Sequence, residues 1–142
     1  MICYAVIDTN VLVSALLSGN EDAATVMVLK NLFDGNIIPV YSDKILAEYN
    51  EVLRRKKFGF SETLIVDLIE TIIKFGVSVT PAVTGEIILD MKDLPFYEVV
   101  MEVRNEEDAY LVTGNIKHFP ERPYIITARQ LLDIMNKYYN ES

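Results

Sequence analysis

Short apolar runs that are rich in β-branched residues alternate along this chain with longer stretches of helical periodicity. The first run, "ICYAVI", carries no charge, as expected of a strand that is covered on both faces of a parallel sheet. Pro39 interrupts the second run and indicates a strand at a sheet edge or of irregular shape. Strand-like runs lie at residues 2–7, 37–42, 77–80, 108–115 and 124–127. The alternation predicts an α/β fold in which helices cover a central, mostly parallel sheet.

The stretches between these runs carry the start and stop signals of helices. Ser42 and Ser61 each precede an amphipathic segment and are expected to cap it at the N-terminus. Gly76 follows the second of these segments and is expected to close it. Helices are therefore predicted at residues 10–17, 21–34, 43–56 and 62–75, after residue 93, and at 128–139.

The length, apolar runs and cysteine content of the chain indicate its domain count and its type of protein. Its 142 residues predict a single domain over residues 1–142. No apolar run approaches the ~18 residues that span a bilayer, and no basic segment precedes the first run, so neither a membrane span nor a signal peptide is expected. The lone cysteine, Cys3, is expected to be a buried free thiol, and the protein is expected to be cytoplasmic.

The net charge of −8 bears on nucleic-acid binding. An acidic protein repels polyphosphate at long range, which argues against a protein that passively coats nucleic acid. The basic residues are unevenly spread, however, because the block "RRKK" contains four of the thirteen. This block is the candidate RNA contact of an enzyme that binds nucleic acid briefly; its members are Arg54, Arg55, Lys56 and Lys57.

A carboxylate ends the first predicted strand. In "YAVIDTNVLVSAL" the apolar run stops at Asp8, and Thr9 and Asn10 follow before a helical pattern begins. The "TGN" turn, with Thr113 and Asn115, ends a later strand. Ligands of open parallel sheets bind beyond the carboxyl ends of the strands, so these two segments are expected to share one site.

The helix predicted after Ser42 offers two further carboxylates. On a helical projection, Glu48 lies about 100° from the centre of the apolar face and Glu51 about 160°. Glu51 is therefore expected to face solvent, whereas Glu48 lies at the border of the core and can reach a cleft.

Three aspartates in the second half of the chain have different predicted roles. Asp93 precedes Leu94 and Pro95, which favours a helix N-cap, although one of its oxygens can still face a cation. Asp90 lies in the same segment. Asp108 begins a strand, so it is expected at the end far from the cleft, in a structural or interfacial role.

The motifs "DTNVLVSAL", "SDKILAEYNEVL", "DMKDLPFYEVV" and "EDAYLVTGNIKHFP", in this order, resemble PIN-domain proteins. The likeness is strongest to the toxins of toxin–antitoxin pairs. It implies a three-layer α/β/α sandwich in which Asp8, Glu48 and Asp93 hold Mg²⁺ or Mn²⁺. The fourth acidic position of the family is Asn115 here, which leaves open whether one or two metal ions bind. The resemblance also implies cleavage of single-stranded RNA, a homodimer and a small antitoxin protein as partner.

The chemistry of such a site explains its composition. Two carboxylates 4 Å apart repel each other by about 4 kcal/mol at an effective dielectric constant of 20, so a cluster of them requires protons or cations. Oxygen ligands suit Mg²⁺ and Mn²⁺, which polarise a phosphodiester and activate water. The neutral side chains of Thr9, Asn10 and Thr113 are suited to orienting the carboxylates.

Two alternatives belong to other classes. A degenerate PIN domain would bind RNA or protein without cleaving it, and Asn115 favours this reading, whereas the three acids oppose it. A phosphatase with an aspartyl nucleophile, as in haloacid-dehalogenase-like proteins, needs a second Asp two residues after the first, where this chain has Asn10. His118, the only histidine, has no nearby partner in the sequence and is expected to be structural.

Overall fold

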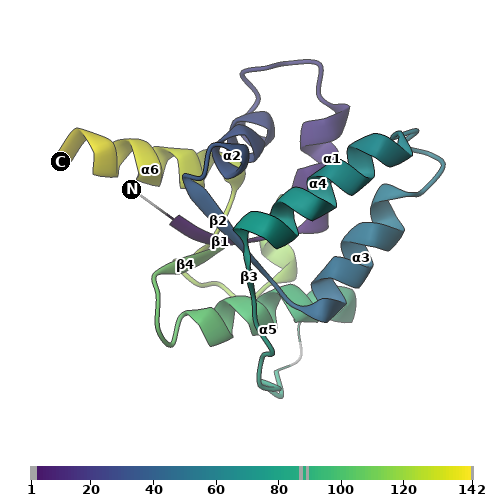
Figure 1. Cartoon of the computed structure of the whole chain (residues 1–142). Coiled ribbons are helices and arrows are strands. Elements are labelled where there is room, and N and C mark those ends of the chain that lie inside the picture. Colours follow the sequence, from purple (N-terminus) through teal and green to yellow (C-terminus); the bar gives the residue numbers. More distant parts are fainter. Residues whose placement is uncertain (1–2, 87, 89, 142) are drawn as a thin grey trace.

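A five-stranded parallel sheet forms the centre of the molecule (Figure 1). This computed structural model describes residues 3–86, 88 and 90–141; Ile2, predicted to start the first strand, lies outside them. The strand order is β3-β2-β1-β4-β5. The strands are β1 (Cys3–Ile7), β2 (Ile37–Tyr41), β3 (Val77–Ser78), β4 (Ala109–Val112) and β5 (Ile125–Ile126). The predicted α/β fold with a parallel sheet is confirmed.

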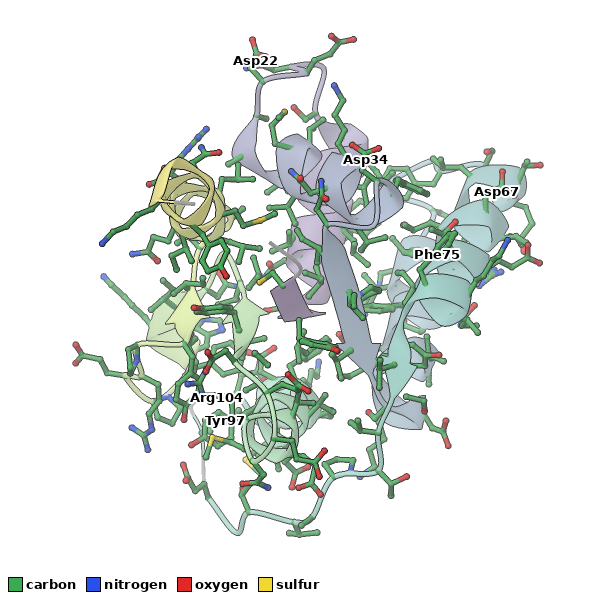
Figure 2. The ribbon with its side chains drawn as sticks, turned by 60° about the vertical axis from the view of Figure 1, so that its left-hand side comes forward. Asp22, Asp34, Asp67, Phe75, Tyr97 and Arg104 are labelled. Carbon is green, nitrogen blue, oxygen red and sulfur yellow. The ribbon has the colours of Figure 1, made fainter. Side chains whose placement is uncertain are left out.

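Helices cover both faces of this sheet. In both views α2 and α6 lie on one side of it and α5 lies on the other, while α3 and α4 pack against each other (Figures 1 and 2). The helices are α1 (Thr9–Leu17), α2 (Ala24–Phe33), α3 (Asp43–Leu53), α4 (Glu62–Phe75), α5 (Leu94–Val103) and α6 (Ala128–Glu141), and two short 3-10 turns are η1 (Met91–Asp93) and η2 (Ile116–His118). None of the helices in the described ranges has the length and apolar character that crossing a membrane requires.

The central strand β1 is almost completely shielded from solvent. Ala5, Val6 and Ile7 are at most 1% exposed, and Cys3 is a buried free thiol, as predicted. Because β1 pairs with β2 on one side and with β4 on the other, its carboxyl end lies in the middle of the sheet edge. The residue that follows β1 is Asp8.

The prediction of an edge position for the strand that contains Pro39 is wrong. Strand β2 lies between β1 and β3, and Pro39 pairs with Ala5 of β1. The pairing with β3 begins only at Val40, so the missing N–H of Pro39 interrupts no rung of that ladder. Gly76, the residue before β3, lies so close to β2 that a Cβ atom on it would be 2.5 Å from the Pro39 carbonyl oxygen.

The predicted helix caps are present. The Ser42 hydroxyl accepts a hydrogen bond from the Ile45 backbone N–H, and the Ser61 hydroxyl accepts one from Leu64. Helix α3 ends at Leu53, however, three residues before the predicted end. The four basic residues that follow Leu53 offer the core no apolar side chain, and the next residue that packs against it is Phe58.

Arg104, at the end of α5, links this helix to the start of β4. Its guanidinium donates to the Ala109 carbonyl at 2.6 Å and lies 4.2 Å from the ring centre of Tyr124. Figure 2 labels Arg104 and Tyr97, which both lie on the α5 side of the sheet. Asp108 is exposed and lies just before β4, whereas Thr113 follows β4. The two residues are therefore at opposite ends of this strand, as predicted.

Candidate active site

Asp8 and Thr113 follow two neighbouring strands and meet at the carboxyl edge of the sheet. The register pairs Ile7 with Val112, so the next residue of each chain segment lies beside the other. The Thr113 hydroxyl donates to Asp8 Oδ2 at 2.7 Å, and Asn10 Nδ2 donates to the same oxygen at 3.2 Å. Asp8 is only 3% exposed. Both side-chain donors thus fix one carboxylate oxygen and leave Oδ1 for another partner.

Helix α3 brings Glu48 to the same place. Tyr49, which is buried, donates its hydroxyl hydrogen to the Ile7 carbonyl oxygen and so ties α3 to the end of β1. Glu48 is half-buried, and its Oε2 accepts a hydrogen bond from the Thr9 hydroxyl. Glu51 is exposed and pairs with Arg55 at 3.0 Å. The orientations of the two glutamates agree with the helical projection.

Asp93 occupies the N-cap position of α5, as predicted, but its side chain makes no capping hydrogen bond. The 3-10 turn η1 precedes the helix, and Asp90 caps this turn by accepting a hydrogen bond from the Lys92 backbone N–H at 3.0 Å. The side chain of Asp93 is therefore not used for capping. Its Oδ2 lies 3.2 Å from Nδ1 of His118.

His118 therefore belongs to the candidate site, which the sequence reasoning missed. Its partner Asp93 is 25 residues away in the chain, so no local pattern links the two. The available signal was the position of His118 three residues after Asn115, in the segment that follows the strand end.

Burial and neighbouring charges shift the pKa values of the three carboxylates. Burial raises the pKa of Asp8 to about 6, and the charges of Asp93 and Glu48 add to this effect, while the Thr113 hydrogen bond opposes it. Burial also raises the pKa of Glu48, with a contribution from Asp93. The pKa of Asp93 is raised by burial and by Asp90, and the His118 hydrogen bond lowers it. The three carboxylates thus influence one another's ionisation and form one electrostatic unit.

Asn115 takes part in the turn beyond β4 through its backbone, unlike the acids, which act through their side chains. Its backbone N–H donates to the Thr113 hydroxyl at 2.9 Å, whereas its side chain is exposed and makes no hydrogen bond within the described residues. Its φ of −121° lies outside the left-handed region, so backbone conformation does not require an asparagine here. Gly114 donates its N–H to Asn10 Oδ1 at 3.1 Å, which fastens this turn to the start of α1.

Two hollows are lined by residues that contact the acids. One of about 610 Å³ lies between α1 and the end of α3 and includes Asn10, Arg55 and Phe58 in its lining. The other, of about 340 Å³, is lined on one side by Lys117 and His118. The first hollow thus includes Asn10, a hydrogen-bond partner of Asp8, and the second includes His118, the partner of Asp93, and each carries a basic side chain.

The basic block is only partly available to a ligand. Arg54 pairs with Glu62 at 2.7 Å, and Arg55 pairs with Glu51. Lys56 and Lys57 are exposed in the turn after α3. Of these four basic residues, Arg55 is the one that lines the hollow beside Asn10.

Among the described residues, Asp90, Asp93 and His118 are the side chains whose ligand atoms all lie within 4.8 Å of one another, and Asp8 and Glu48 do not belong to this group. Within the described ranges no lysine or arginine forms an ion pair with Asp8, Glu48 or Asp93. Acids that are buried or half-buried and have no lysine or arginine partner favour either protonation or a bound cation. Oxygen donors of this kind are the usual ligands of Mg²⁺ and Mn²⁺.

The family comparison agrees with this geometry. A family model described as PIN domain matches residues 4–117, which include Asp8, Glu48, Asp93 and Asn115. The chain belongs to the PIN-domain family, a family of nucleases whose members typically use divalent metal ions. Comparison with curated proteins and with solved structures found no match.

Proposed function

We propose that this protein is a metal-dependent endoribonuclease that cleaves single-stranded RNA. The observation that carries the proposal is that Asp8, which follows β1, Glu48 of α3 and Asp93 of η1 lie close enough for Asp93 to raise the pKa of both other acids. Burial raises the pKa of all three, and the charge of Asp93 raises the pKa of Asp8 and Glu48 further; a divalent cation would relieve that repulsion.

Asp8, Glu48 and Asp93 would hold the ion, which supplies charge neutralisation of the phosphodiester and a more acidic water. The neighbouring neutral groups keep this set in place. Thr113 and Asn10 direct Asp8 by holding its Oδ2, and Thr9 holds Glu48. Neutral donors suit this role because a basic side chain would compete with the cation.

The surface around the acids supports a single strand as substrate. Arg55 and Phe58 on one side and Lys117 on the other can contact a phosphate or a base of a strand that crosses the acids. The net charge of −8 disfavours long-range attraction of RNA, so short-range contacts have to provide the binding.

The biological setting proposed here is that of a toxin in a type II toxin–antitoxin pair. The support is the likeness of the four sequence motifs to the toxin branch of the family. A small antitoxin protein is the proposed partner, a homodimer the proposed assembly, and the cytoplasm the proposed location. Sedimentation of the purified protein, alone and with the product of any small adjacent gene, tests the assembly and the partner.

The activity is tested with end-labelled single-stranded RNA, its duplex and the matching single-stranded DNA. Each is incubated with the protein in Mn²⁺, in Mg²⁺ and in a chelator. We expect cleavage of the single-stranded RNA that requires metal and is lost in Asp8→Asn. Absence of cleavage of several unrelated RNAs in both metals, by folded protein that binds metal, would reject the proposal.

A second candidate function is that of a non-cleaving RNA-binding PIN domain. Asn115 favours it, because the turn beyond β4 provides an amide at that position and no additional charge. Metal-dependent RNA binding without any cleavage distinguishes this function from the nuclease. The phosphatase alternative receives no support, because the amide of Asn10 is hydrogen-bonded to both Asp8 and Gly114.

A further inference from the structure

His118 is close enough to Asp93 for both side chains to bind the same metal ion. Nδ1 of His118 and Oδ2 of Asp93 are 3.2 Å apart. Asp90, Asp93 and His118 each offer one ligand atom, and these three atoms lie within 4.8 Å of one another. Asp90 and Asp93, at η1, precede strand β4 in the sequence, and His118, in η2, follows it.

We propose that His118 is a nitrogen ligand of the metal centre and that it makes this centre prefer Mn²⁺ to Mg²⁺. The inference rests on the proposed function, because it assumes that Asp93 helps to hold a divalent ion. It concerns the identity of the ion, which the carboxylates alone leave undetermined.

The separation of the two atoms is suitable for this role. Two neighbouring ligands on an octahedral ion with bonds of about 2.1 Å lie roughly 3 Å apart. The 3.2 Å between Nδ1 and Oδ2 is close to that value. In such a centre Nδ1 must be unprotonated, so the ring proton lies on Nε2. The same distance also suits a direct hydrogen bond from Nδ1–H to Asp93, and the experiment below separates the two arrangements.

The surroundings of His118 favour ligation. Its side chain is 38% exposed and that of Asp93 is 16% exposed, so an ion can reach both. In the segment after β4, His118 is the side chain that contacts Asp93, whereas the exposed side chain of Asn115 makes no hydrogen bond in the described part of the chain. One oxygen of Asp90 is engaged by the Lys92 N–H, which leaves its other oxygen for the ion or its water.

The chemistry of the donor set then selects the metal. Mg²⁺ strongly prefers oxygen ligands and loses its waters reluctantly, whereas imidazole nitrogen suits transition metals. Three carboxylates without His118 would accept either ion. Adding one imidazole favours Mn²⁺, because Mn²⁺ tolerates mixed oxygen and nitrogen ligands better than Mg²⁺ does.

The composition of the chain makes a direct test possible. His118 is the single histidine, so in protein without a histidine tag any imidazole coupling to bound Mn²⁺ must come from this residue. Pulsed electron paramagnetic resonance of the Mn²⁺-loaded full chain is expected to show this coupling. His118→Gln should abolish it, and Lys117→Ala, a change in the neighbouring exposed residue, should preserve it.

Titration calorimetry measures selectivity independently of activity. We expect His118→Gln to weaken Mn²⁺ binding about tenfold and to change Mg²⁺ binding less than twofold. Thermal denaturation of the metal-free variants confirms that they are folded. Stoichiometric Mn²⁺ binding without imidazole coupling would overturn this inference and leave the proposed nuclease function intact. If the wild-type protein bound neither ion, the proposed function would fail as well.

Discussion

The two halves of the candidate site differ in how the fold holds them. Asp8 follows a central strand, is 3% exposed, and is fixed by Thr113 and Asn10. Asp93 lies in a three-residue turn, is partly exposed, and has His118 as its side-chain partner. The sheet therefore preorganises one half, whereas the other half depends on a contact between two short turns. We expect changes at the first half to affect chemistry and stability together, and changes at the second half to affect mainly metal binding.

The largest effect is expected from Asp8→Asn, which removes a ligand from the half of the site that the sheet preorganises, called the rigid half below. RNA cleavage in Mn²⁺ should fall more than 100-fold, equivalent to about 2.7 kcal/mol. The metal-free variant should melt at a higher temperature than wild type at pH 7.5, because the buried charge is gone. Cleavage assays and thermal denaturation measure the two effects. Activity within about threefold of wild type, or roughly 0.65 kcal/mol, would contradict the assigned site.

Glu48→Gln tests whether α3 contributes to the rigid half, and Glu51→Gln is its matched control on the same helix. We expect about a 50-fold loss of cleavage for Glu48→Gln, because it removes a charged ligand. Glu51 is exposed and pairs with Arg55, so its replacement should change the rate less than twofold. Equal losses in the two variants would show that the helix faces are assigned wrongly.

Thr113→Val removes the hydroxyl that directs Asp8 without changing any ligand. Metal affinity and cleavage should fall about 20-fold, as is usual when a group that orients a ligand is removed. The variant should also be less stable by about 1–2 kcal/mol, because the partly buried hydrogen bond from the Asn115 N–H to the Thr113 hydroxyl is lost too. Urea denaturation and Mn²⁺ titration measure these effects. Thr113→Ser, which keeps the hydroxyl, should restore most of the affinity.

The pH dependence should reflect the raised pKa of Asp8. Folded protein without metal keeps a proton on Asp8 up to about pH 6, whereas the unfolded chain releases it near pH 4. The native state therefore binds more protons between these values, and the free energy of unfolding decreases as pH rises, by up to roughly 3 kcal/mol from this group. Because Mn²⁺ competes with this proton, its affinity should fall roughly tenfold between pH 7 and pH 5.

Urea denaturation at several pH values between 4 and 7.5 measures this dependence in metal-free protein. Asp8→Asn is the control, because it has no proton to lose at this position. Its stability should vary less with pH than that of the wild type. An identical pH dependence in the two proteins would mean that other groups are responsible.

The smallest effect is expected from Asn115→Asp. The exposed side chain lies in the turn next to Thr113, so the new charge should raise Mn²⁺ affinity about threefold through short-range attraction. Wild-type protein is expected to bind one Mn²⁺ per subunit without RNA, and the variant can admit a second ion. Identical stoichiometry and affinity in calorimetric titrations of the two proteins would remove Asn115 from the metal site.

The rigid half was more accessible to sequence reasoning than the half that lies in turns. A charge-free run followed by Asp8 indicates a strand end, and helical periodicity gives the orientation of Glu48, because both patterns are local. The contact between Asp93 and His118 depends on how two turns are placed relative to each other, which no local periodicity encodes. The same limitation explains Pro39, whose tolerance depends on where β3 begins to pair.

The shortness of the outermost strands limits how copies of this protein can associate. Strands β3 and β5 lie at the two edges of the described sheet and contain two residues each. A longer exposed edge would offer a row of backbone donors and acceptors to a second sheet, and such pairing leads to uncontrolled aggregation. Edges of two residues provide too few of these groups for stable strand addition. Any homodimer is therefore expected to form through helices, which also keeps the carboxyl edge of the sheet open to substrate.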